Sequence, residues 1–221
     1  MLDQKQMRML REGAEQFSIT LSEEVVSQFA TFIEEIERWS KIADLLSQTN
    51  PETIIHKHII DSLSLFPWIP SGSRVLDLGS GAGFPGLPLA VTNPEISIIL
   101  IEARRKRANF LKESIRKLGL RNAKAYEGRV EDLSQEKDLQ FAFNVVTTRA
   151  TWNIHLFLAL ANPFLRSNGI AIAMKGPRLS EELVEMFSKI KKIDYFHADT
   201  KSYTLSGNEK RNLALFIKTS L

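Results

Sequence analysis

Apolar residues recur at steps of three and four in the first part of the chain. Within residues 20–46 the positions that follow this period are Val25, Phe29, Phe32, Ile33, Ile36, Trp39 and Ile42. This is the spacing of one helix face, so it predicts a long amphipathic helix, and Thr20 with Glu23 fits a capping box at its start. The dipeptide Asn50-Pro51 predicts a second helix, which continues to about Leu65.

The pattern changes after a proline- and glycine-containing break near residue 72, where short apolar runs begin to alternate with helical stretches. The runs that predict strands are Arg74–Leu78, Ile96–Glu102, Ala123–Glu127, Phe143–Thr147 and Gly169–Met174. This alternation predicts an α/β domain with a parallel sheet. Two later runs, Ile193–Asp199 and Leu213–Lys218, are expected to pair as an antiparallel ribbon. The chain thus divides into a helical extension, residues 1–72, and a sheet-containing domain, residues 73–221.

The composition is that of an ordinary globular protein. Hydrophobic residues make up 43% and charged residues 25% of the 221 positions, which does not indicate a disordered or fibrous chain. No apolar run approaches the roughly 18 residues of a membrane span, and the first residues lack the apolar segment of a signal peptide. We therefore expect a cytoplasmic protein, and a monomer. The absence of cysteine excludes disulfides, thiolate metal sites and covalent cysteine catalysis.

Positive charge is concentrated in one segment. Residues 104–124 contain nine Lys or Arg and the single acid Glu113, which gives +8 locally against a net charge of +3 for the whole chain. Such a segment can follow a phosphate backbone, or it can be the solvated face of a helix. The charge pattern alone leaves both interpretations open.

The segment with the clearest chemical meaning is VLDLGSGAGFPG, residues 75–86, which follows the first predicted strand and opens a helix. Gly79, Gly81 and Gly83 let the backbone turn tightly and approach a ligand at the carboxyl edge of the sheet. Glu102 ends the next strand 19 residues after Gly83, close to the spacing at which an acid accepts hydrogen bonds from ribose hydroxyls. The pattern predicts a nucleotide-type cofactor, either a nicotinamide dinucleotide or S-adenosylmethionine.

Asp77 discriminates between these two cofactors. An acid two residues before the first glycine resembles the first motif of class I methyltransferases, in which it faces a ligand with an amino group and a sulfonium. A dinucleotide pyrophosphate would be repelled by a carboxylate in that place. We therefore favour S-adenosylmethionine over NAD. The alternative for Asp77 is a purely structural cap on the turn.

The kind of methyl transfer follows from what the chain lacks. Enzymes that methylate the amino groups of bases resemble one another in an Asn/Asp-Pro-Pro-aromatic motif after the fourth strand, and residues 147–150 read TTRA instead. Carbon-5 methylation of pyrimidines by the usual covalent route requires a cysteine. Guanine N7 carries a free lone pair at neutral pH, so its methylation needs no general base.

The sequence resembles the RsmG (GidB) family of bacterial 16S rRNA guanine-N7 methyltransferases. The segments that carry the resemblance are KHIIDSL (57–63), DLGSGAGFPG (77–86), GRVE (128–131), RA (149–150) and KG (175–176). The resemblance implies a Rossmann-like, seven-stranded, mostly parallel sheet with an antiparallel last strand, onto which the helical extension packs. It also implies 16S rRNA or the small ribosomal subunit as partner. The residues that it places at the cofactor are Gly79, Phe84, Val130, Glu131 and Arg149.

Two segments depart from the family pattern. Asn-Leu-Thr is common after the tryptophan-containing helix, and this chain has Asp44-Leu45-Leu46; Arg-His-Leu is common near the end, and this chain has Arg211-Asn212-Leu213. The departures keep two alternatives open. One is a paralogous methyltransferase with a different substrate, and the other is a non-catalytic scaffold that binds rRNA.

The expected substrate side of the site centres on Arg149, which ends the fourth predicted strand. Its fixed charge and fork of donors suit a carboxylate, a phosphate or guanine O6, but it cannot act as a base. The other substrate-binding candidates are His58, Asp61, Trp152, Lys175 and Arg211. His58 and Asp61 stand three apart and can meet on one helix face, where a helix-stabilising pair is the alternative. No metal site is expected, because His56 and His58 are two apart and point to different faces.

Overall fold

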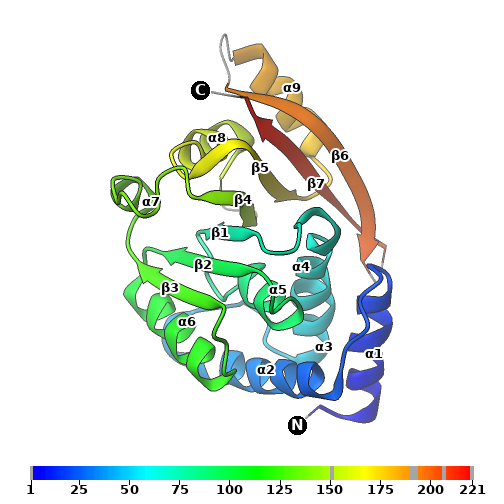
Figure 1. Cartoon of the computed structure of the whole chain (residues 1–221). Helices are drawn as coiled ribbons and strands as arrows, with labels where there is room; N and C mark the ends of the chain where they lie inside the picture. Colours follow the sequence, from blue (N-terminus) through cyan, green and yellow to red (C-terminus); the bar gives the residue numbers. More distant parts are fainter. Residues whose placement is uncertain (1, 150–151, 190–193, 206–207, 220–221) are drawn as a thin grey trace.

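The computed structural model describes residues 2–149, 152–189, 194–205 and 208–219 (Figure 1). In this part of the chain a seven-stranded sheet has the order β3-β2-β1-β4-β5-β7-β6. The strands are β1 Arg74–Leu78, β2 Ser97–Glu102, β3 Ala123–Glu127, β4 Phe143–Arg149, β5 Leu165–Lys175, β6 Tyr195–Leu205 and β7 Glu209–Lys218. Strand β7 runs antiparallel to both β5 and β6, and the remaining pairs are parallel. The predicted fold class is confirmed.

The C-terminal ribbon is longer than the sequence predicted. The pairing of β6 with β7 extends from Tyr195 opposite Lys218 to Leu205 opposite Glu209. Most side chains along β6 are polar and partly exposed, so the apolar run that indicates a strand covers only a fraction of it. Ile193, where the predicted strand begins, lies outside the described residues.

The chain up to Trp68 is helical, as expected. Its helices are α1 Gln4–Glu15, α2 Glu23–Ala43, α3 Pro51–Ile54, the π-helical turn η1 Ile55–Ile60, α4 Asp61–Leu63 and the 3-10 turn η2 Phe66–Trp68. The predicted capping box of Thr20 and Glu23 is wrong. Ser22 is the N-cap, with its side chain accepting from the Val25 amide at 3.3 Å. Glu23 lies in the first helical turn and pairs with Arg11 instead.

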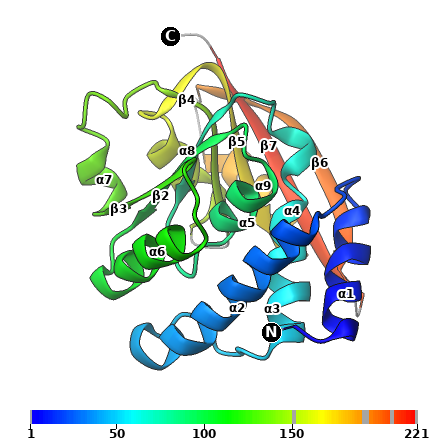
Figure 2. The ribbon, with the colours of Figure 1, turned by 60° about the horizontal axis from the view of Figure 1, so that its bottom comes forward.

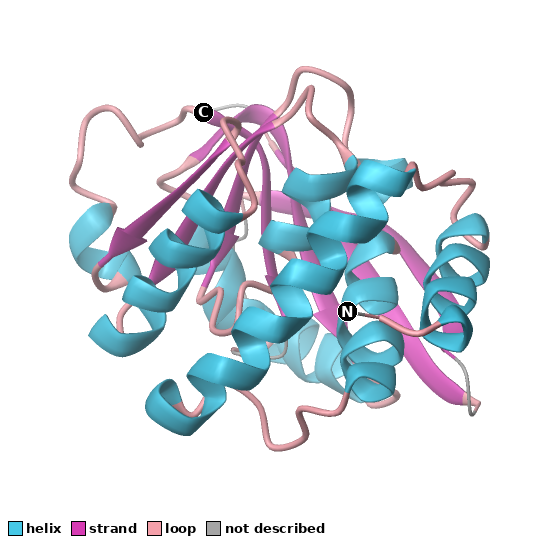
Figure 3. Cartoon of the chain, turned by 90° about the horizontal axis from the view of Figure 1, so that it is seen from below, coloured by secondary structure: helices cyan, strands magenta, loops and turns pink. Residues whose placement is uncertain are grey.

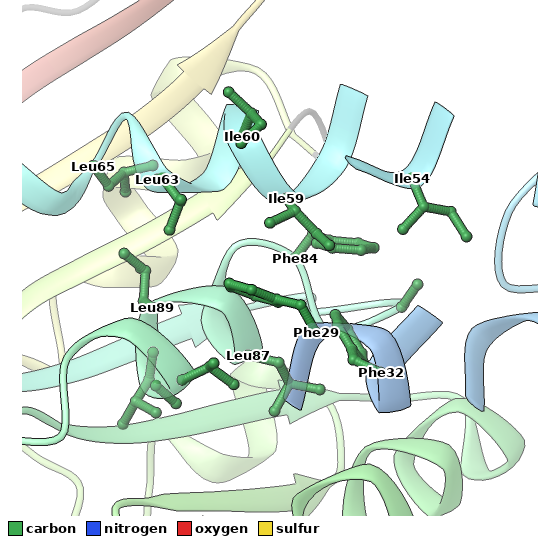
Figure 4. Packing of buried hydrophobic residues seen from close by; sticks show 14 of the residues in the cluster. Phe29, Phe32, Ile54, Ile59, Ile60, Leu63, Leu65, Phe84, Leu87 and Leu89 are labelled. Atoms are coloured by element: carbon green, nitrogen blue, oxygen red, sulfur yellow. The ribbon is translucent and has the colours of Figure 1, made fainter. Parts of the chain in front are cut away.

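The apolar face of α2 packs against the segment that follows the glycine turn. The ring of Phe32 lies 5.4 Å from that of Phe84, measured between centroids, and Figure 4 shows Phe29 and Phe32 among the side chains of α5 and of the helical segment 51–63. Ile42, which the periodicity placed on this face, is 54% exposed. It is the penultimate residue of α2, where the apolar periodicity continues but the side chain is no longer buried.

Helices cover both faces of the sheet (Figures 1 and 3). The helices of the second part are α5 Gly86–Thr92, α6 Arg105–Lys117, α7 Val130–Leu133, α8 Ile154–Ala161 and α9 Leu179–Lys189. One hydrophobic cluster joins the N-terminal helices, α5 and α6 to the sheet, and a second joins α8 and α9 to the other face. Figure 2 shows α2 lying alongside α6. The extension and the sheet thus share a core, and the division near residue 72 as a domain boundary stays a prediction.

No helix in the described ranges combines the length and the apolar character that crossing a bilayer requires.

Candidate active site

The turn between β1 and α5 is built on glycines with left-handed backbone. The φ angles are +67° at Gly79, +56° at Gly81 and +86° at Gly83. A β-carbon on Gly83 would lie 2.6 Å from the side chain of Leu87, whereas one on Gly81 would meet nothing nearer than 3.9 Å. Gly83 is therefore required by packing. At Gly81 the backbone itself is open to an approaching ligand.

Asp77 lies beneath this turn and is completely buried. Its Oδ2 atom accepts a hydrogen bond from the Gly86 amide at 3.1 Å, and Oδ1 has no hydrogen-bond partner among the described residues. Burial raises the pKa of Asp77 to about 7. The Gly86 contact is the structural cap considered above, while the unsatisfied oxygen is suited to a cationic donor from a ligand.

Glu102 is held at the end of β2 by two backbone donors. The amides of Gly81 and Arg104 donate to its two carboxylate oxygens, at 2.9 and 2.8 Å. Each oxygen keeps a further lone pair for a ligand hydroxyl. Glu102 lines a cavity of about 540 Å³, and the other predicted site residues in its wall are Gly79, Val130, Glu131 and Trp152. A volume of this order suits a nucleoside-sized cofactor.

A second cavity, of about 360 Å³, lies where the N-terminal helices meet the carboxyl ends of β4 and β5. Its lining brings together five residues predicted from the sequence, His58, Asp61, Arg149, Lys175 and Arg211. Lys57, Met174 and Gly176 complete the described lining. Four candidates from distant parts of the sequence therefore surround the same space as Arg149. Trp152, which was also predicted as a substrate-binding residue, lines the first cavity instead.

Arg149 is fixed from several sides. Its Nη1 atom lies 3.0 Å from His58 Nδ1 and donates to the Lys57 carbonyl at 3.4 Å. Its guanidinium carbon is 4.9 Å from the centroid of the Phe84 ring. The resemblance placed Phe84 at the cofactor. In the structure Phe84 is buried, and its ring stacks on that of His58 and lies under the guanidinium of Arg149. These contacts align a planar cation at the wall of the second cavity.

The histidine beside Arg149 is neutral. Burial, followed by the charge of Arg149, lowers the pKa of His58 to about 3. Because a guanidinium can only donate, Nδ1 of His58 is the acceptor and the ring proton is on Nε2. His58 therefore orients Arg149 and carries no charge near neutral pH.

Asp61 provides the negative charge of the second cavity. Its carboxylate oxygens lie 3.7 Å from Arg149 Nη1 and 3.8 Å from Arg211 Nε, and Oδ1 accepts from the hydroxyl of Tyr203 at 2.7 Å. Burial raises the pKa of Asp61, and Arg149 and Tyr203 act in the opposite direction. The sequence predicted that His58 and Asp61 could meet on one helix face. In the structure each of them approaches Arg149, His58 by a 3.0 Å contact and Asp61 by an ion pair at 3.7 Å.

Comparison with known proteins identifies the family. The family model described as "rRNA small subunit methyltransferase G" (GidB) matches residues 25–213. The chain belongs to the GidB family. It is similar to the ribosomal RNA small subunit methyltransferase G of Desulfitobacterium hafniense (33% identity over 221 residues, all of this chain and 92% of that protein). The protein of the same name from Syntrophus aciditrophicus is 32% identical over 97% of this chain and 90% of its own length.

Solved structures with much lower sequence identity to this chain show the same fold. TrmN from Thermus thermophilus has a TM-score of 0.56 at 16% identity, with 72% of this chain and 48% of that chain covered. TYW2 from Pyrococcus horikoshii, solved in complex with MeSAdo, has a TM-score of 0.51 at 18% identity, with 92% and 66% covered. At these identities the likeness concerns the fold alone.

The two departures from the GidB pattern have local explanations. Asp44 ends α2 with φ +49°, a conformation that Asn and Asp both tolerate, and its carbonyl accepts from Arg107 at 2.5 Å. The side chain of Asn212 donates to the Gly176 carbonyl and accepts from Ser202. A neutral histidine offers the same combination of one donor and one acceptor. Both positions thus support the walls of the cavities.

The sequence interpretation missed roles that depend on tertiary contacts, both of residues it had named for other reasons and of one it had not named. Arg107 stood in the basic segment, but it lines the first cavity and ties the end of α2 to α6. Lys175 donates to the Trp152 carbonyl and to Glu182 at 2.8 Å, so it also joins Trp152 to α9. Tyr203 carried no motif that could have indicated its contact with Asp61.

Proposed function

We propose that this chain methylates N7 of a guanine in 16S rRNA, with S-adenosylmethionine as the methyl donor. Membership of the GidB family supports the methyltransferase activity, the cofactor and small subunit rRNA as the substrate class. The guanine and its N7 atom are the finer part of the proposal. The observation that carries this part is the second cavity, which presents cations and lacks an unengaged base among its described lining residues.

The first cavity fits S-adenosylmethionine on its own chemistry. Asp77 and Gly81 lie in the turn that leads to this cavity and are outside its described lining; the unsatisfied Oδ1 of Asp77 and the glycine backbone would suit an ammonium group that reaches the turn from the cavity. Glu102 suits ribose hydroxyls, and Val130 with Glu131 would flank the adenine. The bound cofactor supplies an electrophilic methyl group on its sulfonium. The chain's residues then have to bind and orient both reactants.

The second cavity fits an acceptor that needs no deprotonation. Nδ1 of His58 is occupied by Arg149, and the carboxylate of Asp61 is engaged by Tyr203 and by two arginines. Neither group is available to remove a proton from an exocyclic amine. Arg149 can donate to a carbonyl such as guanine O6, which would orient the ring and leave N7 free. The base must first leave its RNA stack to reach such a pocket.

Two measurements test this function. Calorimetry should detect binding of S-adenosylhomocysteine and no response to NAD. Incubation with labelled S-adenosylmethionine, using either deproteinised small subunit rRNA or assembled subunits lacking the modification, should label the rRNA. Digestion to nucleosides should then place the label in 7-methylguanosine. Label in another nucleoside would contradict N7 while leaving the family activity intact. Binding of cofactor without any methyl incorporation would favour the scaffold alternative.

Several cations of the basic segment 104–124 are already paired within the protein. Arg107 binds the end of α2, Arg116 pairs with Glu113, and Lys117 pairs with Glu35. Exposed cations remain at both ends of α6. Arg105 and Lys106 follow the carboxyl end of β2, next to the first cavity, and Arg121 with Lys124 lies at the opposite edge of the sheet. Of these two pairs, the former is the one placed to meet RNA that enters the site.

Neutralising the pair beside the site should therefore affect RNA binding more than neutralising the distant pair. For Arg105→Gln/Lys106→Gln we expect weaker binding and a salt-dependence slope reduced by about 0.7 to 0.9 for each phosphate that is no longer neutralised. Arg121→Gln/Lys124→Gln removes the same charge and serves as the control. The slopes come from filter binding at several salt concentrations, with cofactor affinity unchanged in both variants. Equal slopes for the wild type and the first variant would restore the interpretation of a solvated helix face.

A further inference from the structure

A tyrosine of the C-terminal ribbon reaches the second cavity from outside the predicted site. Tyr203 stands on β6 directly opposite Arg211 on β7, and its hydroxyl donates to Asp61 Oδ1 at 2.7 Å. Phe17, which follows α1, contacts the tyrosine ring edge-on, with 5.9 Å between centroids. The hydrogen bond therefore joins the ribbon to the N-terminal helices, across 142 positions of the sequence.

Asp61 is the point at which these elements converge. Only 3% of the residue is exposed, so its charge has to be supported by neighbours. The charged and titratable groups around it are Tyr203 of β6, Glu209 and Arg211 of β7, Arg149 of β4, and Lys57 and His58 of η1. Of these, the Tyr203 hydroxyl is the donor at normal hydrogen-bond distance, whereas both guanidinium groups lie beyond 3.5 Å.

We propose that Tyr203 is a positioning residue for methyl transfer. Its hydroxyl keeps Asp61 an ionised carboxylate that is aimed at Arg149 and Arg211. The carboxylate in turn helps to hold both guanidinium groups at the wall of the cavity, beside Glu209, which pairs with Arg211 at 2.7 Å. Burial and the adjacent carboxylate raise the pKa of Tyr203, so the phenol stays protonated and remains a donor. The inference rests on the proposed function, because Arg149 affects turnover only if this cavity receives the acceptor.

The variant Tyr203→Phe removes the hydroxyl and keeps the ring. Without its donor, Asp61 should take up a proton at higher pH and hold the two arginines less firmly. We expect kcat to fall about tenfold near neutral pH, with little change in KM for S-adenosylmethionine, and the acid limb of the pH–rate profile to move up by about one unit. Tyr195→Phe is the matched control. Tyr195 lies on the same strand and is buried, but its hydroxyl has no hydrogen-bond partner among the described residues.

A purely structural role for Tyr203 predicts a lower melting temperature with an unshifted pH–rate profile, and that result would overturn the proposal. A second measurement requires no RNA. Burial raises the folded-state pKa of Asp61 above its unfolded value, so the associated stability is present at low pH and is lost as the pH rises through the folded pKa. Loss of the hydroxyl enlarges this effect. The difference in melting temperature between wild type and Tyr203→Phe should therefore be wider at about pH 8 than at about pH 5.

These two readouts separate the inference from the function on which it rests. If the wild type transfers no methyl group to rRNA, the proposed function fails, while the pH dependence of melting still tests the link between Tyr203 and Asp61. A melting difference that is the same at both pH values would refute that link even in an active enzyme. A widened difference together with a shifted acid limb is the result that supports it.

Discussion

Replacing Arg149 by lysine is expected to leave the fold intact and to lower methyl transfer by about 100- to 1,000-fold. The guanidinium contacts His58 and the Lys57 carbonyl, approaches Asp61, and lies over the Phe84 ring. A lysine ammonium keeps the charge but has neither the planar face nor the fork of donors. It cannot hold these contacts and also present a donor to the acceptor base in a fixed direction.

The measurement is single-turnover methyl transfer to small subunit rRNA, with circular dichroism melting to verify the fold. Arg166→Lys is a suitable control, because Arg166 is exposed on β5 and lies outside the described linings of the two cavities. It should match the wild type in both measurements. Near-normal turnover by Arg149→Lys would remove Arg149 from the active site and leave it as an ordering contact between β4 and the N-terminal helices.

Features that are set by residues close to one another in the sequence could be predicted from it. The short apolar runs predicted the parallel strands. The glycines at 79, 81 and 83 predicted the tight turn, because all three adopt the left-handed backbone conformation that glycine tolerates best. Asp77 and Glu102 could be placed because each has a fixed distance along the chain from this turn. Asp77 is buried beneath the turn and Glu102 accepts from the Gly81 amide, as that placement requires.

The remainder of the site depends on contacts between distant segments. The helical periodicity predicted a continuous helix after Pro51, and it gave no sign of the π-helical turn Ile55–Ile60 that carries His58 toward Arg149. Tyr203 lies in a half-exposed, polar strand, where neither burial nor a motif distinguishes it. The resemblance to the family supplied candidates for the cavities, but it could not assign each candidate to one cavity. This is why Trp152 was expected beside the substrate and is found in the wall of the first cavity.

The substitution Gly81→Val is expected to reduce binding of S-adenosylhomocysteine at least about 100-fold. A β-carbon at Gly81 would lie 3.9 Å from the Gly79 carbonyl oxygen and 4.0 Å from Arg107 Nη1, so a valine would add bulk between two residues that line the first cavity. This is the part of the turn at which we expect the cofactor to approach the backbone. The φ of +56° is also strained for a β-branched residue, so the turn would shift and move the amide that donates to Glu102.

Strain alone has to be separated from obstruction of the cofactor site. Gly119 provides the control, because it has φ +66°, no described residue lies within 4 Å of a β-carbon there, and it follows the end of α6 that is remote from the first cavity. Gly119→Val should lose a similar amount of stability, about 1–3 kcal/mol, and should keep full affinity for S-adenosylhomocysteine in calorimetry. Gly81→Ala, with a smaller side chain, should fall between the wild type and Gly81→Val. Tight binding by Gly81→Val would mean that the cofactor does not approach the glycine turn, and the assignment of the first cavity would then be wrong.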